Sequence, residues 1–222
     1  MTFPVVEATN TSQEAGTTSH TVSLPASIAA GDLLIILLFA YDPGLGGPPD
    51  LSTPSGWTQL YDIDDAVSSL AGYYRIADGS EGASVNVVSS NNSNSVHNSY
   101  RISGFTGTPE VSARATGVSA TPNPPSHTPS WGAADTLWLA ITHCANTAAD
   151  LTAPTNYTNI IQANDGAFST GSARRELNAA SEDPGTFAGA DAAVWSALTM
   201  SIQGESAGAA SKMKYYKQRR AA

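Results

Sequence analysis

The sequence has little cysteine and no long apolar run. Its single cysteine, Cys144, excludes an intrachain disulfide, and we expect it to be a small buried residue in a strand. The longest apolar stretch, residues 33–41, is far shorter than the roughly 20 residues that a membrane-spanning helix needs. Residues 1–14 lack the basic segment and apolar run of a secretory signal peptide. We therefore expect synthesis in the cytoplasm.

Charged residues are also scarce, at 13% of the 222 residues, which is about half the usual share. Residues 1–211 contain no lysine, and their five arginines stand against 19 carboxylates, which gives this body a net charge of −14. The last eleven residues carry five cations and no carboxylate side chain. Because binding to phosphates needs clustered cations, an acidic body argues against nucleic acid as its partner.

Catalytic motifs are missing as well. The sequence has no nucleotide-binding loop, Gly-x-Ser-x-Gly elbow, His-Glu-x-x-His motif, Cys-x-x-Cys pair or EF-hand loop. The four histidines are scattered, and His143 and Cys144, as neighbours in a strand, point to opposite faces. No pattern places two carboxylates opposite each other, as glycoside hydrolysis requires. We expect no enzymatic activity, no cofactor and no metal.

What the sequence does contain is an internal repeat, in which four blocks recur in the same order. The clearest pair is PSGWTQL at 54–60 and PTNYTNI at 154–160, an offset of 100. The apolar strand at 33–41 recurs as 136–144, after Asp32 and Asp135. The two remaining pairs are 72–82 with 172–185, and 98–104 with 198–204.

The blocks have the pattern of β-strands separated by turns. Apolar and polar residues alternate in 96–103, and residues 33–41 are apolar on both faces, as in a central strand covered on both sides. Segments rich in Gly, Pro, Asn and Ser, including 89–95, predict loops. The predicted fold is all-β: an antiparallel β-sandwich or jelly roll over residues 1–205. Its repeat halves, about 1–105 and 106–205, are expected to share one core.

Two places in the body are candidate ligand contacts. Asp62, Asp64 and Asp65 follow the first PSGWT block and could chelate calcium with loop carbonyls, although a solvated acidic turn is the alternative. Trp131 follows a proline-rich loop and is the best of the four tryptophans for stacking on a glycan. We expect the other three tryptophans to pack within the fold.

Residues 206–222 form a basic C-terminal tail that differs from everything before it. Such a tail is either a disordered terminus or an arm that docks on an acidic surface, and we favour docking, for example on the body of a neighbouring copy. The candidate partner-binding residues are Lys212, Lys214, Tyr215, Tyr216, Lys217, Arg219 and Arg220.

The amino-acid sequence of several blocks resembles that of a family of virion structural proteins of tailed bacteriophages. The matching segments are PNPPSHTPSWGAADTLWLA (122–140), ARRELNAASEDPGTF (173–187), AAGDLLIILL (29–38) and PSGWT (54–58). The resemblance covers about residues 20–203 and includes no catalytic signature. It implies a jelly-roll-like β fold and a place on the virion surface, as a head decoration protein, a fibre or a tail-tip module.

We therefore expect a structural protein of the virion surface, most specifically a capsid decoration or cement protein. Its expected partners are copies of itself and other virion proteins, such as the major capsid protein or a tail or fibre protein, but neither nucleic acid nor a membrane. The alternative is a receptor- or glycan-binding module of a head or tail fibre, with a host surface glycan as partner. A polysaccharide depolymerase is a third hypothesis.

Overall fold

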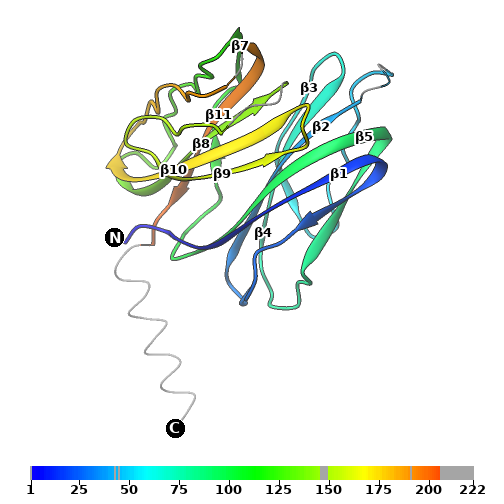
Figure 1. The fold of residues 1–222 in the computed structure, drawn as a ribbon. Helices are drawn as coiled ribbons and strands as arrows, with labels where there is room; N and C mark the ends of the chain where they lie inside the picture. Colours follow the sequence, from blue (N-terminus) through cyan, green and yellow to red (C-terminus); the bar gives the residue numbers. More distant parts are fainter. Residues whose placement is uncertain (1, 43, 45, 146–149, 191, 206–222) are drawn as a thin grey trace.

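A computed structural model describes residues 2–42, 44, 46–145, 150–190 and 192–205 (Figure 1). This part of the chain forms strands and no helix, so it holds no helical segment that could cross a membrane. The strands are β1 (Val5–Ser23), β2 (Leu33–Tyr41), β3 (Thr58–Asp64), β4 (Ser68–Ile76), β5 (Ser84–Ser103), β6 (Glu110–Val111), β7 (Ala115–Ser119), β8 (Ala134–Cys144), β9 (Thr158–Asn164), β10 (Ser169–Ala179) and β11 (Ala193–Gln203).

The strands form two antiparallel sheets that face each other (Figure 1). The first sheet has the order β1-β5-β2-β4-β3, and the second has the order β6-β11-β8-β10-β9, with β7 also paired to β11. The prediction of an all-β antiparallel sandwich is therefore confirmed. The jelly-roll part of that prediction is not confirmed, because strands of a jelly roll cross between its two sheets, whereas β1–β5 stay in one sheet here and β6–β11 in the other.

An apolar core lies between the sheets and takes side chains from both. Alternate residues of the two central strands point inward, as the two-residue period of a strand requires. They are Leu33, Ile35, Leu37 and Phe39 of β2, and Leu137, Leu139 and Ile141 of β8. The opposite face of β2 is equally apolar and equally buried, so the prediction of a central strand covered on both sides is confirmed.

Hydrogen bonds between side chains also join the two sheets within the core. The Tyr100 hydroxyl of β5 lies 2.7 Å from Ser172 Oγ of β10, and Asn98 Nδ2 donates to the same oxygen at 3.1 Å. All three side chains are buried. Because buried polar groups are costly without partners, these bonds favour one relative placement of the sheets over others.

The outer face of the first sheet is covered by the far end of the β1–β5 ribbon, which bends back over it (Figure 1). The register of the ribbon shifts between Glu14 and Ser19, where the bend lies. Beyond the bend, Val22 and Val87 pack on the outward side chains of β2. Ser23 N donates to Ser12 Oγ at 3.0 Å, so β1 contacts itself across the fold.

The prediction of a loop at 89–95 is wrong, because this polar segment lies inside β5. Ser93 and Ser95 are fully buried and bond to the ring nitrogens of His20 at 3.1 and 2.7 Å. A hydroxyl that keeps a hydrogen-bond partner loses little on burial. A serine-rich sequence can therefore continue a strand where a histidine is buried opposite it.

The main path of five strands runs in the same order in both sheets, but its register differs by one residue from the sequence match. Leu33 pairs with Ile102 in the first sheet, and Leu137 pairs with Ile202 in the second. Leu33 therefore corresponds to Leu137, at an offset of 104, and not to Thr136 as the match of 33–41 with 136–144 implied. This shift of one residue matters because it moves every side chain of the strand to the other face of the sheet.

Leu37→Ala is expected to destabilise both sheets at once, because Leu37 is fully buried in the core that they share. We expect a loss of about 2–5 kcal/mol in the free energy of unfolding. Hydrogen exchange measured by mass spectrometry at increasing denaturant should show both sheets opening in one transition. Val118→Ala, at a position 74% exposed, is the control and should change stability by less than about 0.5 kcal/mol. Separate transitions, with only the first sheet affected, would contradict this.

Candidate functional site

The sequence-predicted contacts in the basic tail lie outside the described residues. They are Lys212, Lys214, Tyr215, Tyr216, Lys217, Arg219 and Arg220. Their role stays a prediction from charge alone.

Trp131 is half-buried in the loop between β7 and β8. Its indole Nε1 donates a hydrogen bond to Thr136 Oγ1 at 3.3 Å, so the polar edge of the ring already has a partner within the chain. The neighbouring Ser130 is fixed through its backbone N–H, which donates to Glu110 Oε2 at 2.8 Å. Stacking on a sugar would have to use the exposed part of the ring face.

The three aspartates proposed for calcium lie along β3 and the turn that follows it. Asp64 Oδ1 accepts a hydrogen bond from Ser69 Oγ at 2.6 Å, and Asp65 forms an ion pair with Arg114 at 2.7 Å. Burial, together with the charge of Asp64, raises the pKa of Asp62. Within the described part of the chain, no three His, Cys, Asp or Glu side chains are grouped closely enough to hold a metal ion.

The arginines of the body differ in whether they are paired with carboxylates. Among the described residues, each of the other four body arginines has a carboxylate partner, but Arg174 has neither a hydrogen bond nor an ion pair. The pairs are Arg75 with Asp78 and Glu81, Arg101 with Asp32, Arg114 with Asp65, and Arg175 with Glu182. The body therefore holds most of its positive charge in internal contacts.

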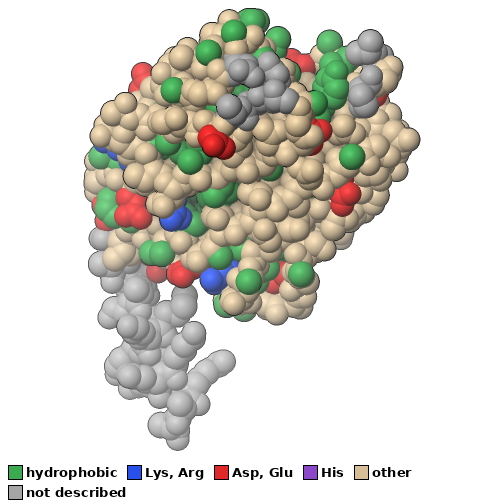
Figure 2. All heavy atoms as spheres, in the orientation of Figure 1, with side chains coloured by type: hydrophobic (Ala, Val, Ile, Leu, Met, Phe, Trp, Pro, Cys, Tyr) green, Lys and Arg blue, Asp and Glu red, His purple; other side chains and the backbone are tan. Residues whose placement is uncertain are grey.

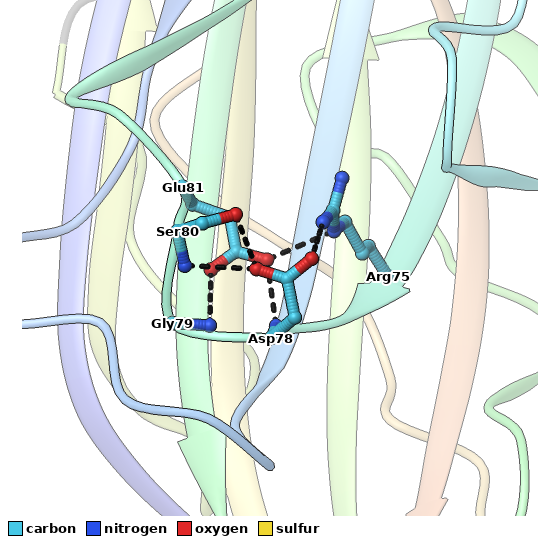
Figure 3. Close-up of polar contacts among 5 residues, drawn as sticks. All are labelled: Arg75, Asp78, Gly79, Ser80 and Glu81. Carbon is cyan, nitrogen blue, oxygen red and sulfur yellow. Dashed lines mark hydrogen bonds and ion pairs between the residues drawn. The ribbon is translucent and has the colours of Figure 1, made fainter.

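The Arg75 cluster, in the turn after β4, shows how a carboxylate is held here (Figure 3). Arg75 Nη2 donates to Asp78 Oδ2 at 2.6 Å, and Arg75 Nε donates to Glu81 Oε1 at 2.9 Å. The Glu81 carboxylate also accepts the backbone N–H groups of Asp78 and Gly79, both at 2.9 Å. The side chain of Glu81 is only 4% exposed, so the guanidinium is capped by the chain itself.

A polar recess of about 350 Å³ lies at the start of β9 and the middle of β10. It is lined by Asn156, Thr158, Asn159, Arg174, Arg175 and Glu176, and we call it the β9–β10 recess. Asn156 and Asn159 have φ angles of 68° and 50°, in the left-handed region, which few residues other than glycine adopt and which is found disproportionately at functional sites. Sequence reasoning missed this site, although the adjacent arginines at 174 and 175 were visible.

A second, apolar feature lies at one end of the sandwich. This end groove has a volume of about 330 Å³ and is lined by Tyr41, Asp65, Ala66, Val67, Ser68, Ala145 and Val194. Val194 is 55% exposed and pairs across the sheet with Val118, another exposed valine. Exposed apolar side chains that adjoin a groove mark a surface suited to contact with another protein.

Buried histidines connect the first sheet to the ribbon that covers it. His97 Nε2 lies 2.7 Å from Ser95 Oγ, which in turn lies 2.7 Å from His20 Nδ1, and His97 Nδ1 lies 2.9 Å from Ser12 Oγ. Burial, assisted by the neighbouring His20, lowers the pKa of His97 to about 3, and burial lowers the pKa of His20. Both rings are therefore neutral at pH 7.

His143 lies in the core beside Phe39, with ring centroids 5.5 Å apart. It is 1% exposed, and neither ring nitrogen has a hydrogen-bond partner in the described part of the chain. Burial lowers its pKa to about 3. As predicted, His143 and Cys144 lie on opposite faces of β8, and Cys144 is buried and free.

Comparison of the chain with family models, with curated proteins and with solved structures gave no match. The arrangement of strands defines the class of this protein, an all-β sandwich of two antiparallel sheets.

His143→Leu is expected to reduce the acid sensitivity of folding. A histidine with a pKa of about 3 in the folded chain and about 6.5 in the unfolded chain binds its proton only on unfolding between these pH values. Stability is therefore highest above pH 6.5 and falls as the pH drops toward 3, by about 3 kcal/mol at pH 4 for one such histidine.

Urea unfolding of the wild type and the variant at pH 7.5 and pH 4 measures this effect. The loss of stability between these two pH values should be smaller by about 3 kcal/mol in His143→Leu. Equal losses in the two proteins would show that His143 is not kept neutral by the fold.

Proposed function

We propose that this chain is a non-enzymatic structural component of the surface of a tailed-phage virion, most specifically a capsid decoration protein. Contacts between subunits and the basic C-terminal arm would hold it on the particle. The observation that carries the proposal is the separation of charge between a body of net charge −14 and a terminal segment with five cations.

The ion pairs of the body support this assignment. Since four of its five arginines are bound to its own carboxylates, few cations remain to neutralise the other acidic groups. On the face drawn in Figure 2, the carboxylates are dispersed and do not gather in one patch. Such a surface attracts a basic segment from a neighbouring copy, and complementary charges of this kind govern orientation and association rate more than affinity.

The end groove provides apolar surface for a contact between subunits, which complementary charge does not provide. Its apolar lining, together with the exposed Val118 and Val194, gives a neighbouring subunit a surface to bury. Apolar contact provides most of the free energy in stable assemblies. We propose that this groove lies in the contact between subunits.

We infer further that the two sheets arose by duplication of one unit. The same order of the five main strands in both sheets supports this. An offset of 100 also relates Thr58 to Thr158 and their strand partners, Tyr74 and Arg174. The turns before these threonines are alike too: Trp57 N donates to Pro54 O at 3.1 Å, and Tyr157 N donates to Pro154 O at 3.0 Å.

The alternative is a glycan-binding module of a head or tail fibre. Trp131 supports it less than the sequence indicated, because its indole N–H is bonded to Thr136. The β9–β10 recess supports it more, since amide, hydroxyl, guanidinium and carboxylate groups meet there.

Deletion of residues 206–222 is expected to leave the fold intact and to abolish incorporation into particles, because the acidic body would lose its cationic partner. The amount of the protein on purified virions, against the major capsid protein, is the readout, and the melting temperature of the isolated variant checks its fold. A full-length variant with the five terminal cations replaced by glutamine separates charge from length and should also fail to incorporate. Normal occupancy of either variant would overturn the proposed role of the arm.

A further inference from the structure

Two arginines at equivalent positions of the two sheets, Arg75 and Arg175, differ in their carboxylate partners. Arg75 and Arg175 hold the same place in β4 and β10, since the residues before them pair with Thr58 and Thr158. Arg75 is bound by two carboxylates from the turn that follows its own strand (Figure 3). Arg175 is bound by one, Glu182 Oε1, at 2.7 Å from Nη1. Arg75 thus has two carboxylate partners within the chain, and its counterpart has one.

The residue at position 156 accounts for part of this difference. Gly56 packs so closely that a Cβ there would lie 2.9 Å from Arg75 Nη1. Its counterpart, Asn156, has a φ of 68° and carries a side chain. Arg175 therefore cannot lie against this turn as Arg75 does, and the β9–β10 recess is found beside it.

The residue before each arginine differs as well. Tyr74 in the first sheet is an uncharged side chain that packs against the core between the sheets, whereas Arg174 in the second has no partner in the described part of the chain. The recess is thus lined by one arginine, Arg174, that forms neither a hydrogen bond nor an ion pair in the described part of the chain. Guanidinium groups bind carboxylates with two parallel N–H···O bonds, and the Arg75 cluster shows this chain satisfying an arginine with carboxylates.

We propose that the β9–β10 recess binds an acidic sugar unit of a polysaccharide through its carboxylate. Arg174 donates to the carboxylate, whereas the Arg175 side chain points to the other face of β10 and stays bound to Glu182. The amide groups of Asn156 and Asn159 and the hydroxyl of Thr158 bond to sugar hydroxyls, and Glu176 accepts from them. The volume of about 350 Å³ is within the range of small-ligand sites, about 300–1,000 Å³.

The lining explains why the ligand is a sugar. All six side chains are polar, so the recess offers an apolar peptide side chain nothing to bury against but offers a sugar many hydrogen-bonding groups. A polyphosphate requires clustered cations, and here one unpaired arginine, Arg174, lies on the same strand face as Glu176, on a body of net charge −14. A single carboxylate surrounded by hydroxyls fits this balance of charge.

This site goes beyond the structural role proposed above and is independent of it. A decoration protein without the site would still incorporate into particles, and loss of the basic arm would leave the recess unchanged. The two proposals therefore fail separately.

NMR titration of the isotope-labelled full-length protein tests the proposal. The acidic probes are trigalacturonate and 3′-sialyllactose, and the neutral probes of matched size are galactotriose and lactose. At least one acidic probe should shift the amide signals of residues 156–159 and 174–176, and added salt should weaken its binding. The neutral probes should bind at least about tenfold more weakly.

Arg174→Gln should weaken binding of the acidic probe at least about tenfold, because it removes the unpaired guanidinium. Arg114→Gln is the matched control: it makes the same change of charge at an arginine bound to Asp65, outside the recess, and should leave binding unchanged. The proposal is overturned if neither acidic probe shifts these signals, if the neutral probes bind equally well, or if Arg174→Gln has no effect. Tighter binding of triglutamate peptide than of both sugars would overturn the assignment to a sugar.

Discussion

Burial of the inward faces of β2 and β8 against each other is the constraint on which the rest of this structure depends. Each central strand places every second side chain in the common core, and a slip of one residue in either would turn those side chains to the other face. Polar contacts refine the packing, since Ser172 accepts from Asn98 and is bonded to Tyr100 across the sheets. Apolar burial supplies most of the stability, and these bonds make one arrangement of the sheets preferable to its neighbours.

A core fixed in this way leaves the edges of the sandwich free to differ. At one end, the end groove exposes Val194 and adjoins the ion pair of Asp65 with Arg114. Elsewhere, the start of β9 and the middle of β10 carry the β9–β10 recess. Apart from Tyr41, which packs against the core, the residues that line the end groove lie outside the core cluster, and so do those that line the β9–β10 recess. The packing of the sheets therefore constrains most of these residues little. Surface groups that packing does not demand are those most open to selection for binding.

The sequence predicted those strands whose pattern depends only on residues close together in the chain. Alternating apolar residues predicted the C-terminal part of β5, and the doubly apolar run predicted β2 as a central strand. It misled at 89–95, because serines usually favour turns and their burial depends on His20, which lies far away in the chain. The β9–β10 recess could not be predicted because it depends on whether Arg174 finds a partner. Only the three-dimensional arrangement decides that.

The proposed duplication gives the recess a physical origin. In the first sheet, the turn after β4 returns Asp78 and Glu81 to Arg75, so this arginine is bound by two carboxylates of its own chain. In the second sheet, the corresponding turn supplies Glu182, which is shared with the Tyr157 hydroxyl at 3.4 Å. One carboxylate then serves two partners, and the neighbouring Arg174 receives none. A repeat whose core is already secure can bind its arginine with one carboxylate instead of two at small cost, since exposed pairs contribute about 0–1 kcal/mol. It can also carry an unpaired arginine, Arg174, where the first sheet has Tyr74.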